Sequence, residues 1–135
     1  MRWLMGAIIG VSLATLSGCA TESGGGTSGF SGTSAEQQLE EANNYYRQGD
    51  YSAAIKRLQS APDIWNDTAE VRVRAHKLLA FSYCVTNQRN LCRQQFSRAL
   101  ELMPTFELSA AEAGHPIWGS EFREAKRLLG TKSSK

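Results

Sequence analysis

The sequence predicts an all-α domain, and three observations support this. Between Ala35 and Leu129 apolar residues recur at spacings of three and four, the period of an amphipathic helix, and strand-like alternation is absent. The chain has only three prolines, Pro62, Pro104 and Pro116, each where a helix is expected to start or stop. A helical pattern also recurs within this region. We therefore expect one small domain built from paired helices.

The repeated pattern has small residues where two antiparallel helices touch and a turn residue between them. The first copy reads Ala42-x-x-Tyr45-Tyr46-x-x-Gly49-Asp50-Tyr51-x-x-Ala54-Ile55-x-x-Leu58-x-x-Ala61. The second copy contains Leu79-Ala80-x-x-Tyr83, Asn87 at the turn in the place of Gly49, Cys92 in the place of Ala54, Phe96-x-x-Ala99-Leu100 and Pro104. This pattern is similar to the tetratricopeptide repeat and predicts about two helical hairpins. A generic four-helix bundle is the alternative.

Two repeats need a cover for their outer face, and the C-terminal part can supply it. Ser109-x-x-Glu112 has the spacing of a capping box. His115-Pro116 suits the first turn of a final helix. The apolar stripe expected on this helix consists of Ile117, Trp118, Phe122, Ala125, Leu128 and Leu129. We expect Gly130 to end the tetratricopeptide-like domain at residues 35–130, with a disordered tail at 131–135.

Residues 1–18 are predicted to be a lipoprotein signal peptide. One positive charge at Arg2 precedes an apolar run that is short for a membrane span. The run ends in Leu16-Ser17-Gly18-Cys19, which resembles the lipobox of bacterial lipoproteins. The resemblance implies acyl chains on Cys19 that hold the mature chain to a membrane. An ordinary secretory signal with a chance cysteine, or a retained anchor, is the alternative.

The residues after the lipobox suggest where the domain resides. Ala20, rather than Asp, follows Cys19, which favours the outer membrane with the domain in the periplasm. Residues 20–34 are mainly Ser, Thr and Gly and cannot bury enough apolar surface to fold. We therefore expect residues 19–34 to form a lipidated, flexible linker.

The later part of the chain, behind a lipobox, resembles the TssQ family of type VI secretion-associated lipoproteins. The residues that carry the resemblance are Ala80-Phe81, Cys84, Cys92-Arg93, Phe96, Ala99-Leu100, Pro104-x-Phe106-Glu107-Leu108, Glu112-x-x-His115-Pro116-x-Trp118-Gly119 and Phe122. The resemblance implies an accessory outer-membrane lipoprotein of a contractile secretion machine, making protein contacts in the periplasm. An envelope-maintenance adaptor, for outer-membrane protein assembly or peptidoglycan enzymes, would use the same anchor and domain.

We find no catalytic constellation and expect no enzyme activity, cofactor or metal. His76 and His115 lack metal-ligand spacing, so we expect an interhelical contact for His76 and a cap or loop contact for His115. Helix capping explains Glu107 and Glu112 better than a paired-carboxylate hydrolase does. A thiol catalyst at Cys84 or Cys92 would need an orienting base and an accessible thiolate.

Cys84 and Cys92 have a second interpretation. If Cys19 is lipidated, these two cysteines remain in an oxidising compartment, close together at the turn end of one hairpin. The sequence leaves open a disulfide, which requires Cα atoms within about 7 Å, or two buried thiols.

The charged residues are distributed unevenly along the sequence. A net charge of +2 gives no global field for nucleic-acid binding. However, residues 71–99 contain no Asp or Glu and six cations: Arg72, Arg74, Lys77, Arg89, Arg93 and Arg98. This region is either a binding surface or a face balanced by Glu36, Glu40 and Glu41.

The repeat pattern predicts which residues would line a binding surface. The first helix of each hairpin lines the concave side, where we expect Asn43, Tyr46, Arg47, Arg74, Lys77 and Phe81. These residues suit an acidic or C-terminal peptide segment of a protein partner, and would also suit anionic lipid headgroups or glycan.

Overall fold

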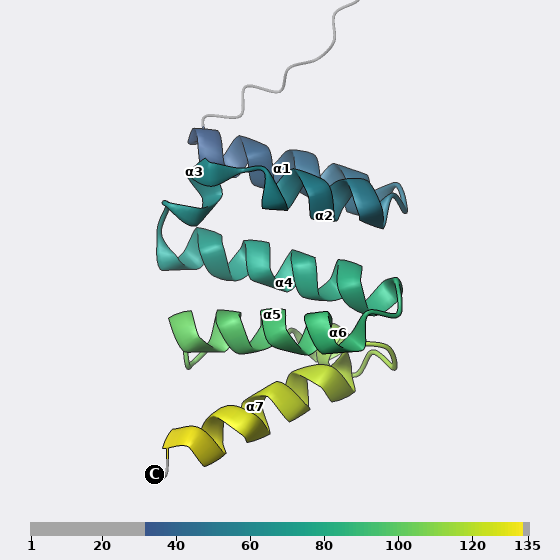
Figure 1. Ribbon diagram of the computed structural model, residues 1–135, viewed down its shortest axis with the longest axis vertical. Coiled ribbons are helices and arrows are strands. Elements are labelled where there is room, and N and C mark those ends of the chain that lie inside the picture. Colours follow the sequence, from purple (N-terminus) through teal and green to yellow (C-terminus); the bar gives the residue numbers. More distant parts are fainter. Residues whose placement is uncertain (1–31, 134–135) are drawn as a thin grey trace, which may run out of the picture.

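The computed structural model describes residues 32–133, and within that range the chain forms seven helices and no strand (Figure 1). The predicted all-α class with helical hairpins is confirmed. The helices are α1 (Ser34–Arg47), α2 (Tyr51–Gln59), α3 (Pro62–Trp65), α4 (Ala69–Val85), α5 (Arg89–Leu102), α6 (Ala110–Ala113) and α7 (Gly119–Ser133).

The helices stack as two hairpins and a cover. The α1–α2 hairpin packs on α4, α4 pairs with α5, and α7 lies across α5 as the last layer (Figure 1). Leu58, Ile64 and Phe96 are fully buried in the core between these layers. Burial of such side chains contributes about 1.5–3 kcal/mol each.

Both hairpin turns have the same hydrogen bonds. After α1 the N–H groups of Gly49 and Asp50 donate to the carbonyls of Tyr46 and Tyr45. After α4 the N–H groups of Asn87 and Gln88 donate to the carbonyls of Cys84 and Tyr83. This is the Schellman arrangement, which places a left-handed residue after the helix. Gly49 has a φ of 81° and Asn87 a φ of 63°, which confirms the predicted turn positions.

The short helix α3 lies between the two hairpins. Its residues explain why corresponding positions of the two pattern copies, such as Gly49 and Asn87, are further apart in the sequence than those of successive tetratricopeptide repeats. Pro62 stands at its first position, where the missing N–H has no cost. Ile64 is buried, and the Trp65 indole Nε1 donates to the Leu58 carbonyl at 2.9 Å. A short additional helix is thus packed between the repeats.

The approach to α7 differs from the prediction. The Ser109–Glu112 capping box is present, but it begins the short helix α6. The final helix starts at Gly119, not at Pro116, because residues 116–118 form a turn that precedes it. A Cβ at Gly119 would lie 2.3 Å from the Ala113 carbonyl oxygen, so this close approach requires glycine.

The predicted stripe of α7 is partly confirmed. Trp118, just before the helix, and Phe122 and Ala125 within it are buried. Leu128 and Leu129 are partly buried. Ile117 is 37% exposed and does not belong to the stripe, because it lies in the turn before α7.

Two domain boundaries in the structure differ from the predicted ones. The helix α7 passes through Gly130 to Ser133, so residues 131–133 are helical and not part of a disordered tail. Gly130 has no positive φ and no proline follows it, while the Thr131 hydroxyl donates to the Leu128 carbonyl at 2.8 Å. At the other end, α1 begins at Ser34, with the Thr33 side chain as its N-cap.

The predicted signal peptide at residues 1–18, the lipidation site Cys19, most of the linker at 19–34 and residues 134–135 lie outside the described residues. Within residues 32–133 the structure contains no helix with the length and apolar character needed to span a membrane.

Candidate partner-binding groove

A groove of about 410 Å³ is lined by residues of α1 and α4, and by Glu112 of α6. Five of the six predicted residues line it: Asn43, Tyr46, Arg74, Lys77 and Phe81. The other lining residues are Glu36, Leu39, Glu40, Leu78 and Glu112. The hairpin register therefore brings together side chains that are far apart in the sequence.

The floor of the groove is apolar and continuous with the core. Leu39 and Leu78 are each 7% exposed and Phe81 is 6% exposed. The Phe81 ring stacks on Trp118 with centroids 4.4 Å apart, and the Tyr46 ring lies 6.4 Å from Phe81. Phe81 therefore both lines the groove and packs within the core against Trp118.

The groove has no excess of positive charge, although residues 71–99 contain only cations among their Asp, Glu, Lys and Arg positions. Arg74 pairs with Glu36 of α1, and the Lys77 Nζ lies 2.9 Å from a carboxylate oxygen of Glu112 on α6. Glu40 also lines the groove. The acids come from other segments of the chain, which a local sequence window cannot include.

Glu112 is anchored in its charged form. Burial acts to raise the pKa of Glu112, but hydrogen bonds from the Lys77 ammonium and the Ser109 N–H outweigh it and hold this pKa below its ordinary value. The Lys77 Nζ also lies 5.7 Å from the centroid of the Phe81 ring. Both cations that line the groove are therefore held by ion pairs within the chain.

Arg47 does not line the groove, in contrast to the prediction. Its guanidinium lies 2.9 Å from the Glu40 carboxylate and also donates to the Asn44 side chain. The reason is helical geometry, because residue 47 is about 100° around the helix from Tyr46 and its side chain points back along α1.

Two polar groups of the groove have no intrachain partner. Neither the Asn43 amide nor the Tyr46 hydroxyl makes a hydrogen bond to any residue between 32 and 133. Burial raises the pKa of the Tyr46 hydroxyl, and the neighbouring Tyr51 and Glu112 add to this, so the hydroxyl keeps its proton. Both side chains are half-buried.

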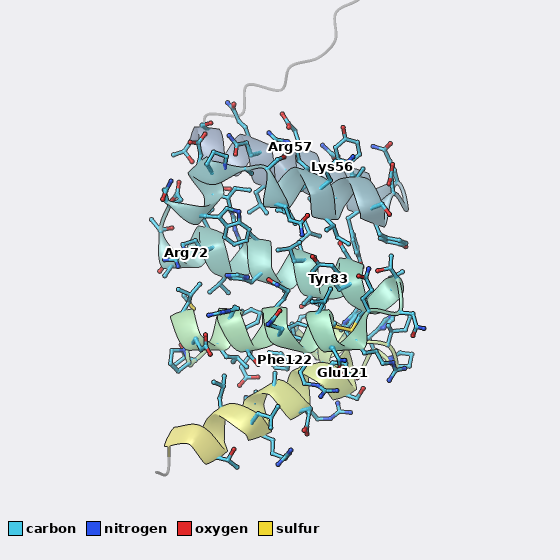
Figure 2. All side chains as sticks on the ribbon, viewed as in Figure 1. Lys56, Arg57, Arg72, Tyr83, Glu121 and Phe122 are labelled. Carbon is cyan, nitrogen blue, oxygen red and sulfur yellow. A yellow bond between two sulfur atoms is a disulfide. The ribbon has the colours of Figure 1, made fainter. Side chains whose placement is uncertain are left out.

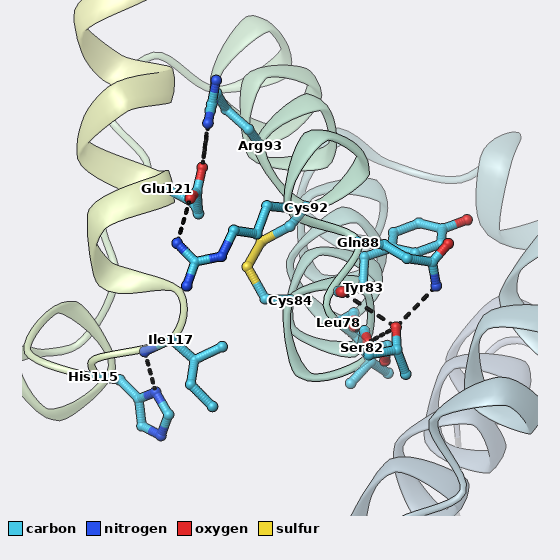
Figure 3. Close-up of a disulfide and its surroundings, with 12 residues drawn as sticks. Leu78, Ser82, Tyr83, Cys84, Gln88, Cys92, Arg93, His115, Ile117 and Glu121 are labelled. Atoms are coloured by element: carbon cyan, nitrogen blue, oxygen red, sulfur yellow. Dashed lines mark hydrogen bonds and ion pairs between the residues drawn. A yellow bond between two sulfur atoms is a disulfide. The ribbon is translucent and has the colours of Figure 1, made fainter.

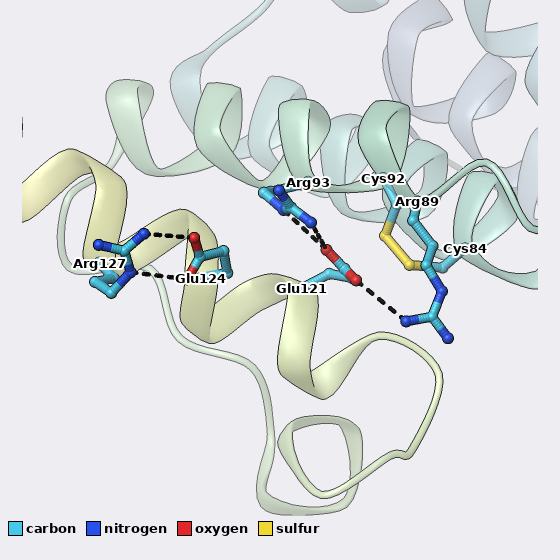
Figure 4. Close-up of polar contacts among 7 residues, drawn as sticks. All are labelled: Cys84, Arg89, Cys92, Arg93, Glu121, Glu124 and Arg127. Atoms are coloured by element: carbon cyan, nitrogen blue, oxygen red, sulfur yellow. Dashed lines mark hydrogen bonds and ion pairs between the residues drawn. A yellow bond between two sulfur atoms is a disulfide. The ribbon is translucent and has the colours of Figure 1, made fainter.

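The remaining cations of α4 and α5 are mostly paired outside the groove. Arg89 and Arg93 both reach Glu121 of α7, at 3.5 and 2.8 Å (Figure 4). Arg98 lies 3.5 Å from Glu101. Arg72, near the first turns of α4 (Figure 2), has no carboxylate partner among the described residues. Five of the six cations thus have a carboxylate partner, but only Arg74 is paired with one of the acids that the balanced-face interpretation named.

Other predicted partners of these cations lie on α1. Glu41 pairs with Arg57 of α2 at 2.6 Å, and Arg57 and Lys56 both lie on α2 (Figure 2). Of the three predicted balancing acids, only Glu36 pairs with a cation of α4 or α5 within the part of the chain that the structure describes.

The two cysteines are joined by a disulfide with Cα atoms 5.2 Å apart (Figure 3). Both residues are buried, at the turn end of the α4–α5 hairpin. Of the two interpretations that the sequence left open, the structure contains the bonded one. A disulfide sulfur is not a nucleophilic thiolate, so this pair offers no thiol chemistry in this form.

The two histidines make the contacts expected of them. The His76 Nδ1 lies 2.8 Å from the Gln95 side-chain oxygen on α5, and its ring centroid is 4.8 Å from Trp65. Burial lowers the pKa of His76 despite the bond to Gln95, and Arg72 and Arg98 lower it further. The His115 Nδ1 accepts from the Ile117 N–H at 3.2 Å, a loop contact (Figure 3).

Sequence reasoning missed Glu121. This carboxylate is only 5% exposed, yet it follows Ser120 in a polar first turn and so has the pattern of a solvent-facing residue. The available signal was the pair Arg89 and Arg93, which lie one helical turn apart on the same face of a helix with no acid beside them in the sequence. Two such cations can hold a buried carboxylate from another segment, because buried charges need partners.

The fold and groove define a class of protein, a stack of helical hairpins with a lined groove. Among residues 32–133 the structure brings together no group of His, Cys, Asp and Glu side chains that could hold a metal ion. No protein-family model matches the chain, and no match was found among curated proteins or solved structures.

Proposed function

We propose that this chain is a non-enzymatic lipoprotein, anchored to the outer membrane through acyl chains on Cys19, whose domain binds a protein partner in the periplasm. The observation that carries the binding role is the groove, where side chains from α1, α4 and α6 meet over an apolar floor. Apolar floors with polar rims are typical of peptide-binding grooves.

The proposal extends to an accessory role in the type VI secretion system. Its support is the resemblance in residues 80–122 to the TssQ family, together with the lipobox at Cys19. Two residues of that resemblance, Phe81 and Glu112, line the groove, and a third, Trp118, stacks on Phe81. A tether would raise the effective concentration of the domain near a membrane-embedded partner, so a weak groove would suffice.

The double variant Arg74→Glu with Lys77→Glu tests the groove as the interface. It places acids beside Glu36 and Glu112, so both ion pairs are lost and the groove becomes strongly negative. The carboxylates of Glu36 and Glu112 then have no cation, and any partner that covers the groove must bury unpaired charge, which is strongly unfavourable. The matched control reverses two exposed cations outside the groove, Lys56→Glu and Arg98→Glu.

The measurement is cross-linking and capture of secretion-system components from the native host, with helicity and melting followed in parallel. We expect the groove variant to lose these components and the control to retain them. Equal capture by both variants would contradict the groove. Capture of outer-membrane assembly factors or peptidoglycan enzymes instead would favour the adaptor alternative.

The anchor has its own test, the variant Cys19→Ser. Serine lacks the sulfur that the lipid transferase alkylates, so we expect an unprocessed precursor without palmitate. Equal palmitate labelling of variant and wild type would contradict lipidation at Cys19.

A further inference from the structure

The charged side chains of the groove are already engaged within the chain. Arg74 is paired with Glu36, and Lys77 with Glu112. An acidic ligand would have to displace a carboxylate from each cation that it binds, and would leave that carboxylate in the groove. Charge is therefore not what the groove has to offer a ligand.

The groups still available are polar and neutral. The Asn43 amide has a donor and an acceptor, and the protonated Tyr46 hydroxyl is a further donor, with no partner for either side chain within residues 32–133. A ligand that covers these half-buried groups must satisfy them, because a buried polar group without a hydrogen bond is unfavourable. A peptide main chain presents the complementary set, an N–H and a C=O on the same edge of each extended residue.

The floor sets the side-chain requirement. Leu39, Leu78 and Phe81 provide the apolar part of the groove lining. In an extended peptide the side chains alternate, so one of them can face this floor while the adjacent main chain meets Asn43. An aliphatic or aromatic side chain is the one that gains from this contact.

On these grounds we propose that the groove binds an extended, uncharged peptide segment with one apolar side chain, and that Asn43 and Tyr46 hydrogen-bond its main chain. This inference rests on the proposed function, because it names the kind of segment that the proposed partner inserts. It replaces the acidic segment that the sequence alone suggested.

The experiment begins with a library of short random peptides, displayed with both ends blocked and selected on the full-length chain in detergent. Selected peptides are synthesised with a fluorescent label, and their Kd is measured by anisotropy. We expect them to contain an aliphatic or aromatic residue and no net negative charge. N-methylation of the amides beside that residue should weaken binding roughly tenfold, because it removes main-chain donors.

The chain supplies matched variants for each side chain. Asn43→Ala should weaken binding roughly tenfold, whereas Asn44→Ala, one residue along α1 and outside the groove, should change it less than about twofold. Tyr46→Phe removes only the hydroxyl and should weaken binding roughly threefold, while Tyr45→Phe on the exposed side should have no effect. Circular dichroism verifies that each variant is folded.

The outcomes separate this inference from the proposed function. Selection of acidic peptides that lose affinity with Arg74→Glu and Lys77→Glu but not with Asn43→Ala would overturn main-chain recognition and leave the groove as the partner site. Failure to select any peptide, or binding that no groove variant alters, would overturn both.

Discussion

The turn ends of the two hairpins have the same backbone and different side chains. The left-handed residues Gly49 and Asn87 occupy equivalent positions, and the hydrogen bonds around them correspond one to one. The number of residues that separates Gly49 from Asn87 also separates Tyr46 from Cys84, and Ala54 from Cys92. The first turn places an aromatic ring in the groove, whereas the second carries a disulfide.

This difference shows how one repeat can serve two purposes. The helix α1 buries three residues and faces solvent on its outer side, while α4 buries ten because it lies in the middle of the stack. The second hairpin is therefore the structural centre, and it is closed covalently and by the buried Glu121. The first hairpin is the edge, where a side chain at the turn can be used for binding.

The largest effect is expected from removing the disulfide. The double variant Cys84→Ala and Cys92→Ala should lower the free energy of unfolding by about 2–4 kcal/mol, because the unfolded chain regains the freedom of the closed loop. Urea denaturation of oxidised proteins measures the difference. Wild type with a reductant should match the variant, and a loss below about 1 kcal/mol would show that the centre of the stack does not need its covalent closure.

The second-largest effect is expected from the buried carboxylate of Glu121, which α7 places against α5. Glu121→Ala should cost about 1–3 kcal/mol, because Arg93 and Arg89 lose their shared acceptor. The matched control is Glu124→Ala on α7, whose pair with Arg127 is exposed (Figure 4). Solvent screens exposed pairs, so we expect the control to change stability much less. Equal losses in the two variants, measured by urea denaturation, would contradict a special role for burial.

These contrasts explain what the sequence could and could not predict. Gly49, Asn87 and the Ser109 capping box were predictable because turns and caps depend on a few neighbouring residues. Five groove residues followed from the hairpin register alone. The identity of the acids that pair with Lys77 and Arg93, Glu112 and Glu121, was not predictable, because these ion pairs join segments that only the tertiary fold brings together.

The equivalence of the two turns can be tested by moving the disulfide. With Cys84 and Cys92 replaced by Ala and Cys19 by Ser, the variant Tyr46→Cys with Ala54→Cys carries the only two thiols, at the same sequence separation as the native pair. We expect a disulfide to form, because the Schellman geometry should bring the two Cα atoms within about 7 Å. It should restore about 2 kcal/mol of stability. Two titratable thiols in the denatured, unreduced protein would mean that the backbones differ.

The smallest effect concerns the left-handed residues themselves. An L-residue with a Cβ loses about 1 kcal/mol or more at positive φ, and asparagine less than alanine because its side chain tolerates this conformation. Gly49→Ala should therefore cost about 1 kcal/mol, and Gly49→Asn, which copies the second turn, clearly less. In the second turn Asn87→Gly should be neutral or slightly stabilising, and Asn87→Ala destabilising.

No atom lies within 4 Å of a Cβ built on Gly49, so backbone conformation and not crowding sets the cost there. Thermal melts of the four variants give the comparison, and an Asn that proves as costly as Ala at position 49 would show that the two turns are related in hydrogen bonding only.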